Sequence, residues 1–198
     1  MNKFFKSAAA ATIILAGLIS SSAQAAEKVP FAGIVIVPAS APPTAQIEIS
    51  QPSFKRGKTV VYASDKKPGS IIINTKTNQL FYVLGMDRAV MYRVATAKKG
   101  FEWTGVNKVS AKTQWPDWRP PVEMLQRRPE LPTFMAGGPK NPLGARAIYL
   151  GSTIYRIHGT NEPKSIGKAA SSGCIRMLNE DVSELYNFVK QGAEVTVM

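Results

Sequence analysis

The chain has 198 residues, of which 25 are basic and 13 acidic, so its formal net charge is +12. This length is sufficient for one domain with a buried core plus flanking segments. The chain has a single cysteine, Cys174, and a single histidine, His158, which excludes a disulfide within the chain and disfavours a zinc site.

Residues 1–25 have the pattern of a secretory signal peptide. Lys3 and Lys6 form a basic start, an apolar stretch covers residues 8–19, and a small-residue motif provides a cleavage site after Ala25. The apolar stretch is shorter than the roughly 20 residues that a membrane-spanning helix needs. We expect export with cleavage after Ala25; an uncleaved N-terminal anchor is the alternative.

Loss of the signal peptide would remove two lysines and no acidic residue, which lowers the net charge from +12 to +10. A basic exported protein is attracted to anionic polymers such as cell-wall glycans, and to membrane surfaces. Nucleic acid is a poor candidate partner, because export removes the protein from the cytoplasm. A basic, well-solvated surface without a partner is an equally good interpretation.

Residues 26–58 are expected to form an extended leader, and residues 59–198 a single domain. The leader contains the proline- and alanine-rich PASAPPTA, which suits a linker, followed by a possible edge strand at residues 47–49. Beyond the leader, β-branched and aromatic runs separated by turn residues predict a mostly β domain. The expected strands are Val60–Tyr62, Ile71–Ile73, Leu80–Leu84, Ala89–Thr96, Lys108–Trp115, Ala147–Leu150, Thr153–His158 and Glu194–Met198.

Residues 116–144 lack clear periodicity, and about thirty such residues are many for a connection in a compact domain. Trp118, Met124, Phe134 and Met135 give this segment apolar and aromatic surface. We expect a lid or binding loop; a loop that merely folds back onto the sheet is the alternative.

One helix is predicted after the cysteine. Asn179 fits an N-cap, and Glu180 and Asp181 place negative charge in the first turn, where the helix dipole favours it. Lys190 is expected in the last turn and Gly192 just beyond the end. The apolar face at helical spacing is Val182, Leu185, Tyr186 and Val189.

The stretch from Arg156 to Met177 contains both His158 and Cys174. A thiol and an imidazole are the minimal parts of a cysteine nucleophile with its base. In an oxidising compartment, a lone cysteine is either an inert buried thiol or a reactive one. An imidazole that takes the thiol proton would make Cys174 reactive towards a carbonyl group.

The neighbours of Cys174 fit acyl transfer. Gly173 permits a sharp turn, so that the amides of Gly173 and Cys174 are candidates for an oxyanion hole, and Arg176 could hold a carboxylate. Each residue also has a purely structural alternative: a core thiol, a hydrogen-bonded histidine at a strand end, a surface cation, and serines that shape a turn. A serine nucleophile is disfavoured because the sequence has no G-x-S-x-G elbow.

The order HGTNEP…SIG…SSGCIRM, followed by N-x-D and LY, resembles the signature of the L,D-transpeptidase catalytic domain (YkuD type), in the manner of its ErfK-like periplasmic members. The resemblance covers roughly residues 59–198. It implies a mostly β, sandwich-like domain with one or two helices, and a cleft partly covered by a lid. It implies Cys174 as nucleophile and His158 as general base and later acid, oriented by a backbone carbonyl for which Gly159 is the candidate.

The resemblance also assigns roles around this pair. Gly173 supplies an oxyanion amide, with Ser172 beside it as support, and Arg176 contacts the substrate. Further motif positions expected at the substrate site are Ser171, Gly159, Thr160 and Asn161.

The implied reaction takes place on peptidoglycan in the periplasm. The thiolate cleaves the bond after residue 3 of a tetrapeptide stem, D-alanine leaves, and the resulting thioester passes its acyl group to an amine. The amine belongs to a second stem, which gives a 3-3 cross-link, or to an outer-membrane protein being tethered to the wall. The resemblance implies no metal or organic cofactor, and it implies acylation by carbapenems.

Two rival functions stay open at this stage. If water replaces the amine, the same site is an L,D-carboxypeptidase or an amidase. A non-catalytic cell-wall-binding module would use the basic surface without reacting. Papain-like and NlpC/P60-type peptidases fit less well, because they place the cysteine before the histidine.

Overall fold

A nine-stranded sheet runs through residues 53–198, the part of the chain that this computed structural model describes. The expected signal peptide and residues 26–52 of the expected leader lie outside the described residues. The strand order is β1-β4-β3-β2-β11-β6-β7-β8-β10, and β5 and β9 form a separate two-stranded sheet. The strands are β1 (Lys58–Val61), β2 (Ile71–Asn74), β3 (Gln79–Gly85), β4 (Arg88–Arg93), β5 (Thr96–Ala97), β6 (Gly105–Gln114), β7 (Arg146–Leu150), β8 (Arg156–His158), β9 (Ala169–Ser171), β10 (Ile175–Arg176) and β11 (Glu194–Val197).

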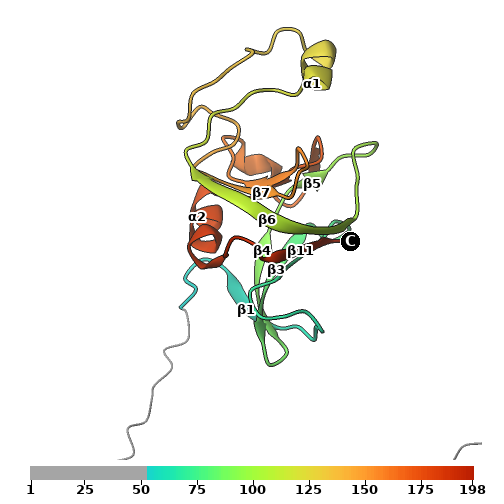
Figure 1. Ribbon diagram of the computed structural model, residues 1–198, viewed down its shortest axis with the longest axis vertical. Coiled ribbons are helices and arrows are strands. Elements are labelled where there is room, and N and C mark those ends of the chain that lie inside the picture. The colour runs from blue at the N-terminus through green and yellow to red at the C-terminus, as the bar shows by residue number, and fades with distance from the viewer. Residues whose placement is uncertain (1–52) are drawn as a thin grey trace, which may run out of the picture. The chain divides into compact units, whose positions relative to one another are not determined.

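The long strand β6 joins two halves of the large sheet. Its residues 105–108 pair with β11, and from Val109 onward it pairs with β7. The register shifts between Val109 and Ala111, an irregularity of the kind that bends a strand. In Figure 1, β6 lies between the half that contains β7 and the half that contains β3 and β4. The result is the mostly β, sandwich-like arrangement that the sequence predicts.

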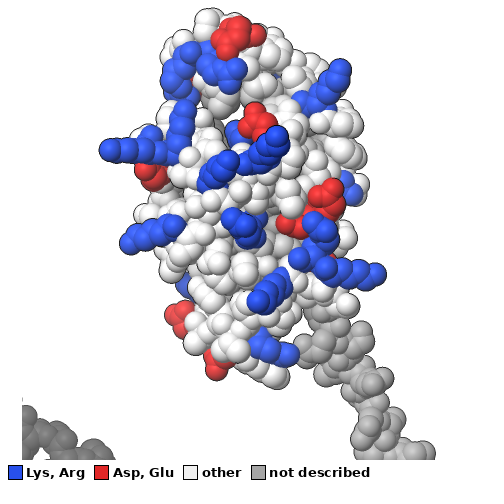
Figure 2. All heavy atoms as spheres, turned by 180° about the vertical axis from the view of Figure 1, so that it is seen from behind, with Lys and Arg blue, Asp and Glu red and all other residues white. Residues whose placement is uncertain are grey.

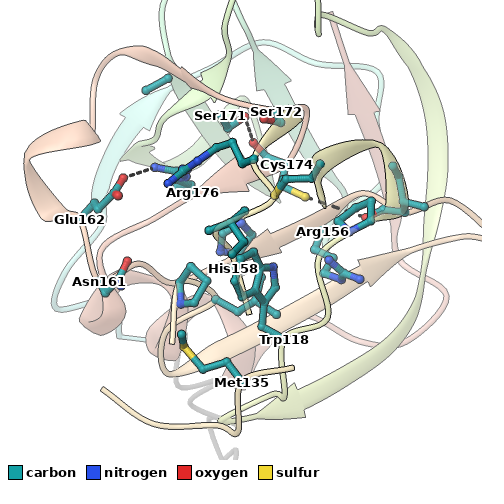
Figure 3. A pocket seen from close by; sticks show the side chains of 18 of the residues that line it. Trp118, Met135, Arg156, His158, Asn161, Glu162, Ser171, Ser172, Cys174 and Arg176 are labelled. Atoms are coloured by element: carbon teal, nitrogen blue, oxygen red, sulfur yellow. Dashed lines mark hydrogen bonds and ion pairs between the residues drawn. The ribbon is translucent and has the colours of Figure 1, made fainter. Parts of the chain in front are cut away.

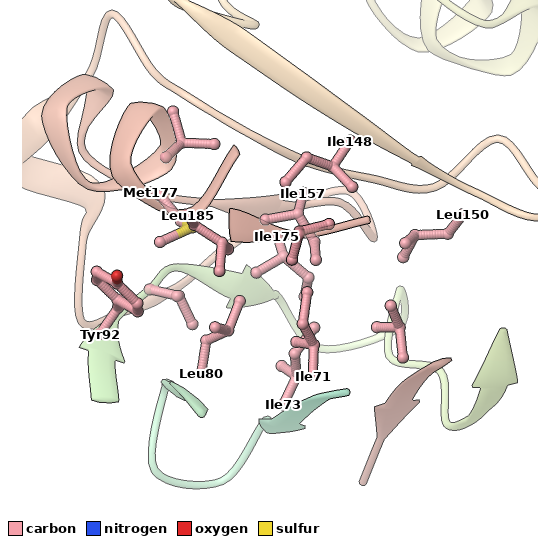
Figure 4. Close-up of a cluster of buried hydrophobic side chains, with 14 of the residues drawn as sticks. Ile71, Ile73, Leu80, Tyr92, Ile148, Leu150, Ile157, Ile175, Met177 and Leu185 are labelled. Carbon is pink, nitrogen blue, oxygen red and sulfur yellow. The ribbon is translucent and has the colours of Figure 1, made fainter. Parts of the chain in front are cut away.

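The two halves enclose one main hydrophobic core, because alternate residues of each strand face inward. Ile71 and Ile73 of β2 share this core with Ile148 of β7 and Ile157 of β8, and all four are fully buried (Figure 4). Leu185 packs into the same core. The core thus fixes β8, which ends in His158, against the rest of the domain.

Two α-helices accompany the sheet: α1 (Val122–Arg127) and α2 (Asn179–Phe188). Helix α1 lies within the segment that shows no clear periodicity, and none of its residues is buried. A short 3-10 turn (Pro163–Ser165) follows the histidine. Within residues 53–198, no helix is long and apolar enough to cross a membrane.

Helix α2 matches the predicted helix, but the prediction for its start is wrong. Leu178, not Asn179, occupies the N-cap position, and no side chain caps the helix there. Asn179 is the first helical residue, and its amide group bonds to two other segments of the chain, as described below. The predicted apolar face is present, since Val182 and Leu185 are fully buried.

The prediction for the end of α2 is also wrong. The helix ends at Phe188 and the backbone is already extended at Val189, so that Lys190 lies beyond the last turn. The terminal carbonyls are bonded by Lys112 of β6, whose Nζ lies 2.6 Å from the carbonyl oxygens of Tyr186 and Val189. A cation from a distant strand therefore supplies the positive charge that the end of a helix favours.

Residues 54–57, at the end of the expected leader, are attached to α2. The Glu184 carboxylate accepts hydrogen bonds from the amides of Lys55, at 2.6 Å, and Gly57, at 2.9 Å. It also accepts one from the hydroxyl of Tyr92, at 2.8 Å. One carboxylate thus holds the leader's last residues against both α2 and β4.

Truncation of a core side chain on α2 should destabilise the whole domain. Leu185→Ala removes a fully buried side chain, which typically lowers the free energy of unfolding by about 2–5 kcal/mol because a cavity remains. Val61→Ala is the control, since Val61 is 87% exposed and should change stability by less than about 0.5 kcal/mol. Urea unfolding of both variants measures the difference, and similar losses would contradict this account of the core.

Candidate active site

The pairing of β8 with β10 brings the histidine and the cysteine together. The two strands are parallel, with Ile157 opposite Ile175 and His158 opposite Arg176. Ile157 and Ile175 point into the core, where both are buried. Because side chains alternate along a strand, the flanking residues point to the opposite face. Those residues are Arg156, His158, Cys174 and Arg176, and all four line one pocket of about 680 Å³.

Figure 3 shows this pocket with Cys174 close to His158 and an arginine on either side. The His158 side chain is nearly buried, and its Nδ1 lies 2.6 Å from the carbonyl oxygen of Gly159, the expected orienting group. A carbonyl can only accept, so Nδ1 carries the hydrogen and Nε2 is left to receive a proton. This hydrogen bond therefore fixes both the tautomer and the ring orientation of the imidazole.

Asn179 holds the backbone that carries this histidine. Its Oδ1 accepts hydrogen bonds from the amides of Ala145, at 3.0 Å, and Thr160, at 3.1 Å. Its Nδ2 donates to the carbonyl oxygen of Thr160, at 3.0 Å. A Cβ atom at Gly159 would lie only 2.2 Å from Oδ1, so only glycine fits this close approach. Asn179 thus clamps two loops instead of capping its own helix.

The loop before β10 holds Cys174 through its backbone. The Ser171 hydroxyl donates to the carbonyl oxygen of Cys174, at 2.5 Å, and accepts from the amide of Gly173, at 3.1 Å. The Trp103 indole Nε1 donates to the carbonyl oxygen of Gly173, at 2.7 Å. The Cys174 thiol itself lies 3.9 Å from the carbonyl oxygen of Ile154. The carbonyl of the Gly173–Cys174 peptide and the peptides on either side of it are therefore bonded to neighbouring residues.

Burial keeps both members of the pair uncharged in the resting protein. It lowers the pKa of His158 to about 3, and the nearby Arg176 and Arg156 act in the same direction. Burial also raises the pKa of the Cys174 thiol above its ordinary value, although both arginines partly oppose this by favouring the thiolate. Both shifts favour a neutral thiol and a neutral imidazole over an ion pair.

Cations dominate the pocket wall. Among the described residues of the wall, Glu162 is the only acidic one, and it pairs with Arg176 across 2.7 Å. The Arg156 guanidinium lies 5.3 Å from the ring centre of Tyr149, and its buried Nε has no hydrogen-bond partner among the described residues. The cationic residues of the wall are Lys98, Arg127, Arg128, Lys140, Arg156 and Arg176.

The other residues expected at the site separate into two groups. Ser171, Ser172 and Asn161 line the pocket, and the Asn161 side chain donates to the carbonyl oxygen of Lys140, at 2.9 Å. Thr160 is 3% exposed and bonds to Asn179 behind the pocket wall. Gly159 lies with it and supplies the carbonyl that orients the histidine.

Residues 116–144, the lid segment expected from the sequence, also contribute to the pocket. They supply an apolar wall, in which Trp118 and Met135 are linked by a pair of backbone hydrogen bonds of 2.8 Å each. Asn141 fastens this segment, since its Nδ2 donates to the carbonyl oxygens of Met135 and Ala136. The apolar lining residues from this segment are Trp118, Pro121, Met124, Leu131, Pro132, Met135, Pro142 and Leu143.

Sequence reasoning missed Arg156, Glu162 and Trp103. Arg156 could have been found, because it precedes His158 by two residues and must share its face of the strand. Glu162 and Trp103 reach the site through loops, and no local pattern indicates their position. Among residues 53–198, no group of three or more His, Cys, Asp or Glu side chains is arranged to hold a metal ion.

Comparison with solved structures identifies the class of fold. An L,D-transpeptidase from Mycobacterium smegmatis superposes with a TM-score of 0.53 at 14% identity, over 65% of this chain and 57% of that one. A mutant of Enterococcus faecium L,D-transpeptidase gives 0.54 at 16% identity, over 67% and 50%. The domain therefore has the fold of L,D-transpeptidase catalytic domains.

The family follows from the sequence itself, because the model of the YkuD family, the L,D-transpeptidase catalytic domain, matches residues 68–197. This chain belongs to that family. It is 34% identical over 137 residues to the probable L,D-transpeptidase ErfK/SrfK of Escherichia coli K12, covering 65% of this chain and 43% of that protein. A 59-residue stretch is 54% identical to the putative L,D-transpeptidase YkuD of Bacillus subtilis, covering 30% and 36%. The match thus spans less than half the length of these relatives.

Asn179→Asp should destabilise the domain, although an acidic residue in a first helical turn is normally favourable. The new carboxylate cannot donate to the Thr160 carbonyl and would face it as a second acceptor. We expect the free energy of unfolding to fall by about 1–3 kcal/mol. Asn187→Asp on the exposed side of the same helix is the control for an added charge, and should lower stability by less than about 1 kcal/mol, since a negative charge in a last turn is only mildly unfavourable. Equal or greater stability of Asn179→Asp would contradict the clamp.

The rate at which iodoacetamide alkylates Cys174 should reveal the neutral pair. Since burial raises the thiol pKa above 9.0 and only the thiolate reacts, the rate should increase about tenfold per pH unit through neutrality, without a plateau below pH 9. Mass spectrometry measures the rate, with Cys174→Ala as the blank and free cysteine as the reference. A flat rate from about pH 5 to pH 8 would instead indicate a thiolate–imidazolium pair.

Proposed function

We propose that the chain is a peptidoglycan L,D-transpeptidase with Cys174 as nucleophile and His158 as general base and acid. The observation that carries the proposal is the placement of a free thiol and a buried, carbonyl-oriented imidazole in one basic pocket. Membership of the L,D-transpeptidase family supports the same reaction class.

The first half-reaction forms a thioester. As Cys174 Sγ attacks the carbonyl carbon of the third residue of a tetrapeptide stem, its proton moves to Nε2 of His158. The peptide bond to the terminal D-alanine then breaks, and the imidazolium gives its proton to the leaving amine. A neutral starting pair suits this general-base route, because the proton is transferred only when the nucleophile attacks.

The second half-reaction returns the enzyme to its resting state. An acceptor amine attacks the thioester carbonyl, His158 takes a proton from the amine, and the thiolate leaves. The proton then returns to sulfur, which restores the neutral pair. One imidazole thus serves both steps, since each needs a base on the attacking group and an acid on the leaving group.

The charge of the pocket supports a peptide-stem substrate. A tetrapeptide stem ends in a carboxylate, and the six cations of the wall would attract such an anion. Arg176 is the candidate carboxylate ligand, because its guanidinium lies on the same strand face as His158 and already holds the carboxylate of Glu162 at 2.7 Å. Binding of a substrate carboxylate would replace or share this ion pair.

The lid segment supports transfer over hydrolysis. Its apolar residues line the pocket opposite the thiol, where they would keep water from the thioester while an amine-bearing acceptor occupies the site. Hydrolysis, which would make the protein an L,D-carboxypeptidase or amidase, is therefore the competing outcome that the assay must distinguish.

We propose a periplasmic location, based on the signal-like residues 1–25. In the space-filling view of Figure 2, Lys and Arg side chains are spread over the whole visible face, with acidic side chains scattered between them. Such a surface would favour the anionic cell wall. The acceptor amine would come from a second stem peptide or from an outer-membrane protein.

Purified protein incubated with a disaccharide tetrapeptide should release D-alanine and form cross-linked dimers, as measured by liquid chromatography and mass spectrometry. Cys174→Ala should form neither product. His158→Gln keeps a side chain of similar size without the base, and should slow turnover by about 100-fold or more. Release of free tripeptide alone would replace the transpeptidase with a carboxypeptidase.

Two controls make the result specific to the site. A carbapenem should add its mass to Cys174 in the wild type and not in Cys174→Ala. Urea unfolding should show that both variants remain folded. If Cys174→Ala acquires the carbapenem mass as fast as the wild type, the nucleophile is another residue.

A further inference from the structure

Trp103 contacts the nucleophile loop from the connection between β5 and β6. Its Nε1 donates to the carbonyl oxygen of Gly173, at 2.7 Å. Its ring is stacked on the ring of Tyr155, with centres 4.4 Å apart and an angle of 5° between the planes. The Tyr155 ring in turn packs on Gly173, where an added Cβ would lie 2.5 Å from a ring carbon. Two aromatic rings from different loops thus hold one peptide unit.

The bonded carbonyl belongs to the same peptide unit as the amide of Cys174. The described chain contains no cis peptide bond, so the C=O of Gly173 and the N–H of Cys174 point in opposite directions across one rigid plane. A donor that fixes the carbonyl therefore also fixes the direction of the N–H. Trp103 is absent from the described residues that line the pocket, whereas Cys174 lines it. The indole accordingly holds the plane from the side away from the pocket.

This N–H matters because the other candidate oxyanion donor is already engaged. The Gly173 amide donates to the Ser171 hydroxyl at 3.1 Å. The same hydroxyl donates to the carbonyl oxygen of Cys174, so the serine secures the peptides on either side of the Gly173–Cys174 unit. Gly173 also has a φ of +113°, a conformation that requires glycine. Because glycine has wide backbone freedom, the orientation of the Gly173–Cys174 peptide depends on these hydrogen bonds.

We propose that Trp103 is a positioning residue for the oxyanion hole, acting through the Gly173 carbonyl to aim the Cys174 amide at the oxyanion. The hydrogen bond to the carbonyl also polarises the peptide, which makes its N–H a stronger donor. The inference rests on the cysteine acyl chemistry of the proposed function, but not on the identity of the stem peptide.

Two reagents separate aiming of the amide from reactivity of the thiol. 4-Nitrophenyl acetate acylates a thiol through a tetrahedral oxyanion: the sulfur–acyl bond forms and 4-nitrophenolate leaves. Iodoacetamide alkylates the same thiol by displacement of iodide, and no oxyanion develops. The ratio of the two second-order rate constants at Cys174 therefore reports the oxyanion hole alone, with Cys174→Ala as the blank for both.

Trp103→Phe keeps an aromatic ring for the stack on Tyr155 and removes the N–H donor. We expect the acylation-to-alkylation ratio to fall by about tenfold to a hundredfold. This is no more than the rate loss of about a hundredfold or more that removal of one oxyanion donor causes, because the Cys174 amide is misaligned and not removed. Trp115→Phe, the same change at a partly exposed tryptophan outside the pocket wall, should leave the ratio unchanged.

Three outcomes overturn the inference. The first is an unchanged ratio in Trp103→Phe, and the second is a parallel loss of both rates, which a purely structural role would give. The third is a wild-type acylation rate no higher than that of a free thiol of the same pKa. If Trp103→Phe does not fold, benzothienylalanine at position 103 provides the same test, since it replaces only the N–H by sulfur. If the wild type does not turn over the tetrapeptide, but Trp103→Phe still lowers the acylation-to-alkylation ratio, the proposed substrate is rejected and this inference stands.

Discussion

The parallel pairing of two short strands, β8 and β10, determines where His158 and Cys174 lie. With Ile157 and Ile175 both committed to the core, strand alternation sends their neighbours to the opposite face. The histidine and the cysteine, sixteen residues apart in the sequence, therefore meet because hydrophobic burial fixes the isoleucine next to each of them. A one-residue slip of either strand would exchange the core and pocket faces. The same isoleucines that stabilise the fold thus also specify the geometry of the site.

The electrostatics of the site follow from this placement. Side chains on the pocket face of β8 and β10 lie close to the core, and burial lowers the pKa of His158 and raises the pKa of Cys174, which favours the neutral form of each. The alternation that presents them also presents an arginine beside each one. Those cations would stabilise a developing thiolate and attract anionic groups, without charging the resting pair.

Much of the fold could be predicted from the sequence because the relevant signals are local. The strands around Ile71 and Leu80 are short apolar runs bounded by turn residues, and the face of α2 has helical spacing. The roles of Asn179 and Lys112 could not be predicted in this way. In the sequence, Asn179 has the pattern of a helix N-cap, although in the structure it clamps two loops. Lys112 has the pattern of an exposed strand lysine, although in the structure it bonds to the end of a helix. Only the long-range contacts of the folded chain distinguish them.

The residues of the candidate site also divide into those with a local sequence signal and those placed only by long-range contacts. Its histidine and cysteine are unique in the chain and lie in a dense motif, so residue type and spacing single them out as candidates. Trp103 and Glu162 have no such signal, because they come from two separate loops. Glu162 lines the pocket, whereas Trp103 contacts the loop that carries Cys174. Helix α2 links the histidine loop to the start of the described domain. Its first residue, Asn179, clamps the histidine loop, while Glu184 in its middle holds residues 55–57. Since a helix resists bending over ten residues, a segment that precedes the sheet and the loop that follows His158 are fixed relative to each other by one element.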